Sequence, residues 1–326
     1  MAEKILQIRN LRVTFETPFG QVFAVRGVDL DVEEGELLGV VGESGSGKSV
    51  TFLAAIGLLS SRARVTGSVV LQGEELIGKT PQQMRSVRGR LMAMIFQDPL
   101  SALNPVHRVG KQIVEMLQSH QNLTNKQAAT RAVELLDLVG IPQPEQRSNQ
   151  YPHEFSGGMR QRVVIAIAIA NNPKLLIADE PTTALDVTVQ AQILEVIKRV
   201  QQQFGTAVVL ITHDLGVIAR VADRVDVMYA GRNVEQGLVD NLYDHPSHPY
   251  TRGLLSSIPQ AGKDRLTPIR GFPPNMMSPP SGCAFRTRCE FAEPSCEVDI
   301  PELKMFNDLQ TACLRAHQLP SFQVRQ

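Results

Sequence analysis

The sequence predicts an α/β protein with a doubly wound core, a helical insert near residues 85–170 and an irregular C-terminal module. Three short apolar runs fit strands that are buried on both faces, as in a parallel sheet. They are Glu36–Val41, Leu175–Ala178 and Ala207–Ile211. Helical patterns alternate with these runs over residues 1–232, which favours a core of alternating strands and helices. After about Asn233, proline-rich segments replace the periodicity.

The segment after Thr124 carries the signals of a complete helix. Thr124 and Gln127 have the spacing of a capping box, in which each side chain bonds a backbone N–H at the helix start. The helix is expected to end before Gly140, with Pro142 just beyond it.

A second helix is expected from about Val187 to Phe204, with Gly205 as its stop. Apolar side chains recur on one face of this segment at helical spacing. They are Ile193, Ile197, Val200 and Phe204.

The composition argues against several classes of protein. The 326 residues suggest one large domain or two smaller ones. Lys+Arg and Asp+Glu are both 33, a balance that argues against a protein that coats nucleic acid. The longest apolar run, Val163–Ala170, is far shorter than the roughly 20 residues of a membrane-spanning helix. The N-terminal segment lacks the pattern of a signal peptide, so the chain is expected in the cytosol.

A phosphate-binding loop is predicted at Gly42–Ser49, which matches G-x-x-x-x-G-K-[ST]. Glycines let backbone N–H groups approach phosphate oxygens, and a helix that starts at the loop favours anions. Lys48 is expected to reach the β- and γ-phosphates, and the Ser49 hydroxyl to bind Mg²⁺. The other residues expected around the phosphates are Gly42, Ser44, Gly45 and Gly47.

Polar residues at the ends of other strands extend this site. The run Leu175–Ala178 leads into Asp179, placed to hold Mg²⁺ through water, and Glu180, placed to polarise an attacking water. Gln97 and His213 each follow another apolar run and are expected to reach the γ-phosphate. Taken singly, a polar residue at a strand end is more often part of an ordinary turn.

Ser156, Gly157 and Gly158 form a second anion-binding design at a helix start, with a hydroxyl and bare backbone amides. An arrangement in which two subunits face each other would explain why one chain has two phosphate-binding helix starts. The loop of one subunit would then meet the Ser-Gly-Gly of the other.

All four cysteines lie between Cys283 and Cys313. In a reducing cytosol they do not indicate a disulfide framework. Four cysteine ligands suit either tetrahedral zinc or an iron–sulfur cluster, and free thiols are a third reading. Their wide spacing lacks the usual zinc knuckles and fits the larger cluster better. The residues are Cys283, Cys289, Cys296 and Cys313.

These motifs resemble those of an ABC transporter ATPase subunit over about residues 5–235. All six motifs of that family occur in its order. They are GESGSGKS for Walker A, FQDP for the Q-loop, FSGGMRQR for the signature, LLIADE for Walker B, TALD (Thr183–Asp186) for the D-loop and ITHD for the H-loop. The fold implied is an ABC-type P-loop ATPase core with a mixed, mainly parallel sheet and a helical subdomain at about 85–170.

The C-terminal part resembles that of dipeptide and oligopeptide importer ATPases. The residues that carry this likeness are His248-Pro249-Tyr250, the late cysteines, Phe96–Pro105 and Tyr151–Met159. Met159 departs from the glutamine of many ABC signatures, and the HPY segment alone also fits a plain proline turn. The resemblance implies an ATPase domain at 1–232, a C-terminal module at 233–326 and a 4Fe–4S cluster on the four cysteines.

The family likeness also implies a role for each catalytic residue. Glu180 would be the general base, and His213 would hold the γ-phosphate and the attacking water. Gln97 would sense the γ-phosphate and pass its state to a permease. The implied Mg²⁺ ligands are Ser49, Gln97 and Asp179.

Two further residues take their roles from the resemblance. Phe15 matches the aromatic residue that stacks on adenine, with Phe19 and Phe23 as rival candidates and a core position as the alternative. Asp186 would bridge two ATPase subunits.

The function implied is ATP hydrolysis that energises an importer of di- or oligopeptides, with ATP between two ATPase subunits. The expected partners are two transmembrane permease subunits, a second, related ATPase subunit, and an extracytoplasmic binding protein reached through the permease, with no nucleic acid. The expected location is peripheral, on the cytoplasmic face of the inner membrane. Nickel chelates, glutathione and antimicrobial peptides are alternative cargoes.

Two other classes of function are weighed against import. A soluble ABC protein of DNA repair or translation would show a long coiled coil or two cassettes, and residues 49–156 lack sustained heptads. A regulator without turnover is disfavoured by the intact Lys48, Asp179, Glu180 and His213.

Overall fold

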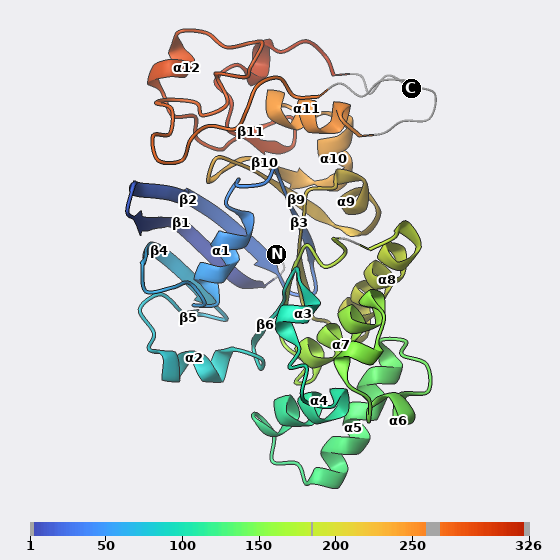
Figure 1. The fold of residues 1–326 in the computed structure, drawn as a ribbon. Helices are drawn as coiled ribbons and strands as arrows, with labels where there is room; N and C mark the ends of the chain where they lie inside the picture. The colour runs from blue at the N-terminus through green and yellow to red at the C-terminus, as the bar shows by residue number, and fades with distance from the viewer. Residues whose placement is uncertain (1–2, 184, 259–267, 323–326) are drawn as a thin grey trace. The chain divides into compact units, whose positions relative to one another are not determined.

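The computed structural model describes residues 3–183, 185–258 and 268–322, and the chain divides into two compact units (Figure 1). The first unit contains residues 1–5, 32–36 and 78–209. The second contains residues 6–31, 37–77 and 210–326. The boundary at 209/210 falls within strand β8, Ala207–Thr212, so that strand belongs to both units.

The first unit joins two parallel strands to a set of helices. Strand β6, Met92–Ile95, pairs with β7, Leu175–Asp179, and every residue of both is buried. Such a doubly buried pair explains why the two runs are apolar without alternation. The helices are α2 (Pro81–Val87), α3 (Pro99–Ala102), α4 (Val109–Gln118), α5 (Asn125–Leu138), α6 (Pro144–Arg147), η1 (Pro152–Glu154), α7 (Gly157–Ile169) and α8 (Val187–Phe204).

Helices α4, α5 and α7 pack on one another and form the helical part of this unit (Figure 1). The predicted capping box of α5 is confirmed, because Thr124 accepts from the Gln127 N–H and Gln127 accepts from the Thr124 N–H. The stop of α8 is also confirmed, since Gly205 has the left-handed φ of 62°. Strand β6 lies inside the range 85–170, so between β6 and β7 the described elements are all helical.

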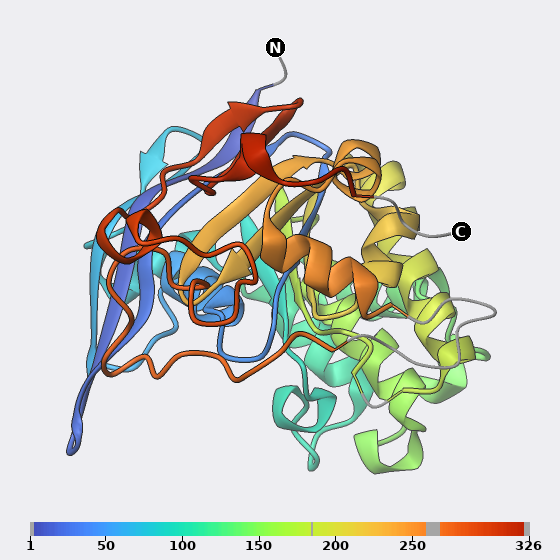
Figure 2. The ribbon, with the colours of Figure 1, turned by 90° about the horizontal axis from the view of Figure 1, so that it is seen from above.

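The second unit holds most of the remaining strands. Strand β3, Leu37–Val41, is parallel to β9, Arg224–Tyr229, and β9 is antiparallel to β10, Arg232–Leu238. The sheet continues through β12 (Leu309–Thr311) to β11 (Lys304–Phe306), which Figure 2 shows in red beside β10. The mixture of parallel and antiparallel pairs confirms the predicted mixed sheet. The helices of this unit are α1 (Lys48–Ala55), α9 (Leu215–Val221), α10 (Val239–Asp244), α11 (Pro249–Ser256), α12 (Ser295–Val298) and η2 (Ala316–Gln318).

A separate four-stranded sheet has the order β2-β1-β4-β5. Its strands are β1 (Lys4–Thr17), β2 (Gly20–Glu33), β4 (Ala63–Leu71) and β5 (Glu74–Glu75). Strands β1 and β4 are antiparallel, and their register pairs Phe15 with Ala63. This sheet therefore places Phe15 beside the first residue of β4.

The C-terminal segment is more regular than the sequence predicts. The predicted proline turn at His248 is the start of α11, where the His248 ring accepts from the Tyr250 N–H and Pro249 occupies the first helical turn. The boundary expected at 232/233 lies at the beginning of β10, which pairs with both β9 and β12. The division into 1–232 and 233–326 stays a prediction.

Among the described residues, none of the helices combines the length and the apolar character that a bilayer crossing requires.

A buried carboxyl group connects β10 to the C-terminal segment. The side chain of Glu235 accepts from the Ser247 N–H at 2.6 Å and from the Thr311 hydroxyl at 3.0 Å. Glu235 is fully buried, and this burial raises the pKa of its carboxyl to about 7. The group is therefore a site where pH acts on stability.

We expect Glu235→Gln to flatten the pH dependence of stability between pH 4.5 and 7. The pKa of Glu235 in the folded state lies above the ordinary value of 4.5. The protonated carboxyl therefore contributes its full stabilisation of the fold below pH 4.5, and this contribution is lost as pH rises through about 7. At pH 8 the variant should exceed the wild type by about 1–3 kcal/mol in urea unfolding. Exposed Glu74→Gln is the control, and an unchanged pH profile in Glu235→Gln would contradict the prediction.

Candidate nucleotide site

The phosphate loop joins the end of β3 to the start of α1 and depends on two of its glycines. A Cβ atom at Gly47 would lie 2.6 Å from the carbonyl oxygen of Ala24, and one at Gly42 would collide with that of Met228. Both residues also have positive φ, at 99° and 152°. The close backbone thus excludes side chains at the two ends of the loop.

Lys48 folds back over the loop that precedes it. Its Nζ donates to the carbonyl oxygens of Gly42 at 2.7 Å and Glu43 at 3.0 Å, and to the Ser46 hydroxyl at 3.4 Å. Lys48 is 5% exposed, so its charge lies within the loop instead of in open solvent. Binding of a phosphate by this ammonium group stays a prediction.

In the first unit, the predicted Gln97 and Glu180 meet. The Gln97 Nε2 donates to Glu180 Oε2 at 3.1 Å, and the Thr183 hydroxyl donates to the same oxygen at 2.9 Å. Glu180 directly follows β7 and has a positive φ of 46°, which is unusual for a residue with a Cβ. The sequence predicts a strand-end position for each of these two residues, whereas the hydrogen bond between them and the positive φ of Glu180 leave no sequence signal.

The Ser-Gly-Gly segment is the helix start that the sequence predicts. Ser156 caps α7, because its hydroxyl accepts from the Met159 N–H at 3.3 Å. A Cβ at Gly158 would lie 2.5 Å from a methyl carbon of Val189, so α7 approaches α8 closely there. Asp186 caps α8 by accepting from the Val189 N–H at 3.0 Å. Small residues thus let the signature helix pack beside the D-loop end of α8.

The remaining predicted residues lie at strand ends or on strands. Asp179 is the last residue of β7 and is buried, whereas His213 follows β8 directly and is exposed. Phe15 is half-buried on β1, and its rival Phe19 is 87% exposed. Their roles toward Mg²⁺, the γ-phosphate and adenine stay predictions.

Two residues that touch the phosphate loop have no role in the sequence-based prediction. Tyr250 accepts from the Glu43 N–H at 2.7 Å, and Arg288 forms an ion pair with the Glu43 side chain. Tyr250 belongs to the HPY segment, so the family likeness singles out its position in the sequence but not its contact with the loop. Arg288 has no local pattern that could indicate a partner so far away in the sequence.

The four cysteines line one cavity of about 20 Å³ together with aromatic residues. None of the four forms a disulfide. Within the described ranges, no three His, Cys, Asp or Glu side chains are arranged to hold a single metal ion. This finding supports neither the tetrahedral zinc alternative nor the 4Fe–4S cluster, which stays a prediction.

Burial keeps the thiols of Cys283, Cys289 and Cys313 protonated near neutral pH. Burial raises the pKa of Cys313 to about 12 and that of Cys289 to about 11. The neighbouring cysteines add to this rise, whereas hydrogen bonds from backbone N–H groups to the sulfur atoms oppose it. The pKa of Cys283 is raised for the same main reason. Any metal that binds here must therefore displace protons, and its charge would lower these pKa values.

Two family models match the chain. The ABC transporter model matches residues 25–183, and the model of the oligopeptide/dipeptide transporter C-terminal region matches residues 234–296. The oligopeptide transport ATP-binding protein OppD of Bacillus subtilis is 53% identical over 294 residues, which covers 89% of this chain and 82% of that protein. The chain belongs to the oligopeptide/dipeptide family of ABC transporter ATP-binding proteins.

Other members of this ATP-binding family align over nearly the whole chain. The dipeptide transport ATP-binding protein DppD of Bacillus subtilis is 50% identical, covering 95% of this chain and 93% of its own length. OppD of Escherichia coli K12 is 47% identical, covering 94% and 91%. The predicted family resemblance is therefore confirmed for both the cassette and the C-terminal region.

Solved structures of ABC cassettes have the same fold. The dimeric post-hydrolysis state of the ATP-binding cassette MJ0796 bound to ADP and Pi has a TM-score of 0.65 and 26% identity. It covers 72% of this chain and 98% of that one. The ABC-type ATPase fold predicted from the motifs is thus confirmed.

We expect Gly47→Ala to impair the loop far more than Gly45→Ala. At Gly47 the new Cβ meets the Ala24 carbonyl, whereas at Gly45 nothing lies within 4 Å and only the positive φ of 78° opposes alanine. Gly45→Ala should cost about 1 kcal/mol of unfolding free energy, and Gly47→Ala about 1–3 kcal/mol with loss of nucleotide binding. Thermal unfolding and titration with a fluorescent ATP analogue measure both, and equal effects would contradict the prediction.

Proposed function

We propose that this chain hydrolyses ATP and thereby energises an importer of di- or oligopeptides. The observation that carries the chemistry is the hydrogen bond from Gln97 to Glu180, which joins the predicted γ-phosphate sensor to the predicted general base in one unit. The names of its relatives, oligopeptide and dipeptide transport ATP-binding proteins, support peptide import. Nickel chelates, glutathione and antimicrobial peptides are the alternative cargoes.

In this proposal the phosphate loop binds ATP and Glu180 activates the attacking water. The amides of Ser44, Gly45 and Gly47 surround the phosphates, and Lys48 compensates their charge. Mg²⁺ would be held by Ser49, Gln97 and Asp179 and would neutralise charge that develops on the phosphates. The hydroxyl, amide and carboxylate groups of these residues supply oxygen ligands, which suit this cation.

Glu180 is oriented for proton transfer by its neighbours. Gln97 and Thr183 both donate to Oε2, which fixes the plane of the carboxylate. As general base the carboxylate accepts a proton from the water that attacks the γ-phosphate. His213 would bind the γ-phosphate, and Phe15 would stack on adenine.

A second ATPase subunit would complete each nucleotide site. The capped start of α7 presents Ser156, Gly157 and Gly158 as an anion-binding end, and Asp186 lies at the start of the neighbouring helix. Each subunit would offer this end to the ATP on its partner. The dimeric state of the MJ0796 cassette supports such an arrangement. We propose a related subunit as the partner, which gives a heterodimer.

The proposed transporter contains two permease subunits and an extracytoplasmic binding protein that reaches this chain through the permease. The chain would lie peripherally on the cytoplasmic face of the inner membrane. ATP drives the cycle because it binds the closed pair of ATPases better than the open pair. Hydrolysis removes this difference and reopens the pair.

We expect Glu180→Gln to lower ATP turnover by about 10²–10⁴ while ATP binding persists, because the amide cannot accept the proton. Steady-state hydrolysis and ATP titration measure the two effects, and exposed Glu145→Gln is the control. Undiminished turnover would remove Glu180 from the role of base.

The same variant tests the transport assembly. With Mg-ATP it should stay closed and co-purify from native membranes with two permeases and a second ATPase, identified by mass spectrometry. Recovery of ribosomes or nucleic acid instead would overturn the import function and leave the ATPase chemistry. The substrate of the binding protein that pairs with those permeases would decide among the cargoes.

We also propose that the four cysteines bind a 4Fe–4S cluster. The donor set fits, since four thiols on one cavity can each ligate a different iron. A cavity of about 20 Å³ has room for about one water, so the thiols must move apart to bind the cluster. Its role would be structural, with ligation contributing to the folding of this segment.

Anaerobically purified protein should be brown and contain about four iron and four sulfide per chain. Cys289→Ser should lose iron and colour, because one ligand is missing, whereas Ser295→Ala in the same segment should keep both. Elemental analysis and visible absorption measure this. Colourless protein with stoichiometric zinc would contradict the cluster.

A further inference from the structure

The C-terminal segment holds the phosphate loop through a partly buried, bidentate ion pair. Arg288 Nη1 lies 2.6 Å from Glu43 Oε2, and Nη2 lies 3.0 Å from Oε1. The Arg288 side chain is only 3% exposed and that of Glu43 is 27% exposed. Bidentate guanidinium–carboxylate pairs fix both partners in direction as well as in distance. Glu43 is the second residue of the loop, so this contact acts at its start.

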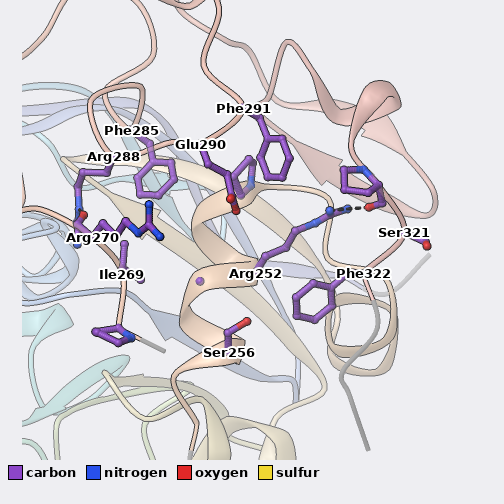
Figure 3. A pocket seen from close by; sticks show the side chains of 14 residues that line it. Arg252, Ser256, Ile269, Arg270, Phe285, Arg288, Glu290, Phe291, Ser321 and Phe322 are labelled. Atoms are coloured by element: carbon purple, nitrogen blue, oxygen red, sulfur yellow. Dashed lines mark hydrogen bonds between the residues drawn. The ribbon is translucent and has the colours of Figure 1, made fainter. Parts of the chain in front are cut away.

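Several groups position the guanidinium of Arg288. Its Nε donates to the Arg270 carbonyl oxygen at 2.8 Å, and its Cζ lies 5.8 Å from the ring centroids of both Tyr229 and Phe285. Arg288 and Phe285 are neighbours on the wall of a cavity of about 550 Å³ (Figure 3). The hydrogen bonds to Glu43 raise the pKa of Arg288, so its guanidinium stays charged. Arg288 is thus held rigidly toward Glu43.

Tyr250 holds the backbone of the same loop residue. Its hydroxyl accepts from the Glu43 N–H at 2.7 Å, and the residue is fully buried. The Tyr250 ring packs against Tyr229 and Phe285, with centroids 4.6 and 5.4 Å away. Glu43 is therefore fixed twice, once at its amide and once at its carboxylate.

Other residues of the C-terminal segment also lie along the loop. Pro273, Pro274 and Met276 share the lining of a small cavity with the loop residues Glu43–Ser46. The Met276 carbonyl oxygen accepts from the Phe23 N–H at 2.9 Å, which ties this stretch to β2. The segment thus borders the loop at more than one point.

Fixing Glu43 also fixes the groups that bind phosphate. Its carbonyl oxygen accepts from Lys48 Nζ at 3.0 Å, and the amides of Ser44 and Gly45 follow directly in the chain. A shift of Glu43 would move the lysine and these amides away from their anion-binding positions. Preorganised donors bind an anion more tightly because less order must be created on binding.

We propose that Arg288 and Tyr250 are positioning residues for ATP, which set nucleotide affinity by holding Glu43. This inference rests on the proposed ATPase function, because it assumes that the loop binds ATP. It assigns to the C-terminal segment a direct role in the nucleotide site of the same chain. Neither residue touches the nucleotide in this role.

The test compares nucleotide affinity in two neighbouring arginine variants of the full chain. Arg288→Gln should raise the Kd for a fluorescent ATP analogue, and the KM for ATP, by about tenfold, which is about 1.4 kcal/mol, while kcat changes by less than about threefold. The control is Arg286→Gln, since Arg286 bonds Ser281 instead of the loop. Its Kd and KM should equal those of the wild type.

A double-mutant cycle separates positioning from plain stabilisation. If the pair acts as a unit, Glu43→Gln and Arg288→Gln together should raise Kd no more than either alone. Tyr250→Phe removes only the hydroxyl and should give a smaller rise in Kd. Arg288→Lys keeps the positive charge but cannot form the bidentate pair with Glu43. This variant replaces Arg288→Gln in the test if Arg288→Gln fails to fold.

The measured Kd, KM and melting temperature distinguish a positioning role of Arg288 from a purely structural one. A lowered melting temperature with Kd and KM equal to the control would make Arg288 purely structural and overturn the proposal, as would additive effects in the cycle. If the wild type and Arg286→Gln fail to bind ATP, the proposed ATPase function falls instead. A KM increase confined to the Glu43, Tyr250 and Arg288 variants supports the positioning role.

Discussion

Backbone amides that surround a phosphate need a loop with no side chains in the way, and this requirement governs the structure around β3 and α1. At Gly42 and Gly47 the carbonyl oxygens of Met228 and Ala24 occupy the space of a side chain. The loop must also leave a strand and enter a helix within six residues, from Gly42 to Gly47. The parallel pairing of β3 with β9 supplies the rigid base for this turn.

Buried polar groups that hydrogen-bond to named partners organise the second unit around that loop. Asp226 accepts from Asn233 at 2.6 Å, and burial raises its pKa to about 7. His248 caps α11, and burial lowers its pKa to about 3, so it remains neutral as an acceptor. Such groups are costly to bury, and their hydrogen bonds specify how the C-terminal segment packs.

Local sequence signals predicted much of this fold, but they could not predict contacts between residues far apart in the sequence. The capping box at Thr124 and the stop at Gly205 follow from the physics of helix ends, so the sequence suffices there. Gln97 and Glu180 were each predicted to lie at a strand end of the nucleotide site, because ligands bind at the carboxyl ends of strands. The pairing of Arg288 with Glu43 depends on tertiary packing alone, and no spacing rule links residues so distant. The α11 start at His248 was missed because a proline serves both turns and helix starts.

The bond between Glu43 and Arg288 has a consequence for how such chains diversify. A cassette whose loop depends on an arginine beyond its own sheet cannot exchange its C-terminal segment freely with another cassette. Loss of the arginine would leave a carboxylate without its counter-ion beside the phosphate site, where negative charge repels the ligand. A chain assembled from two cassettes would therefore need Glu43 and Arg288 to be kept or exchanged together.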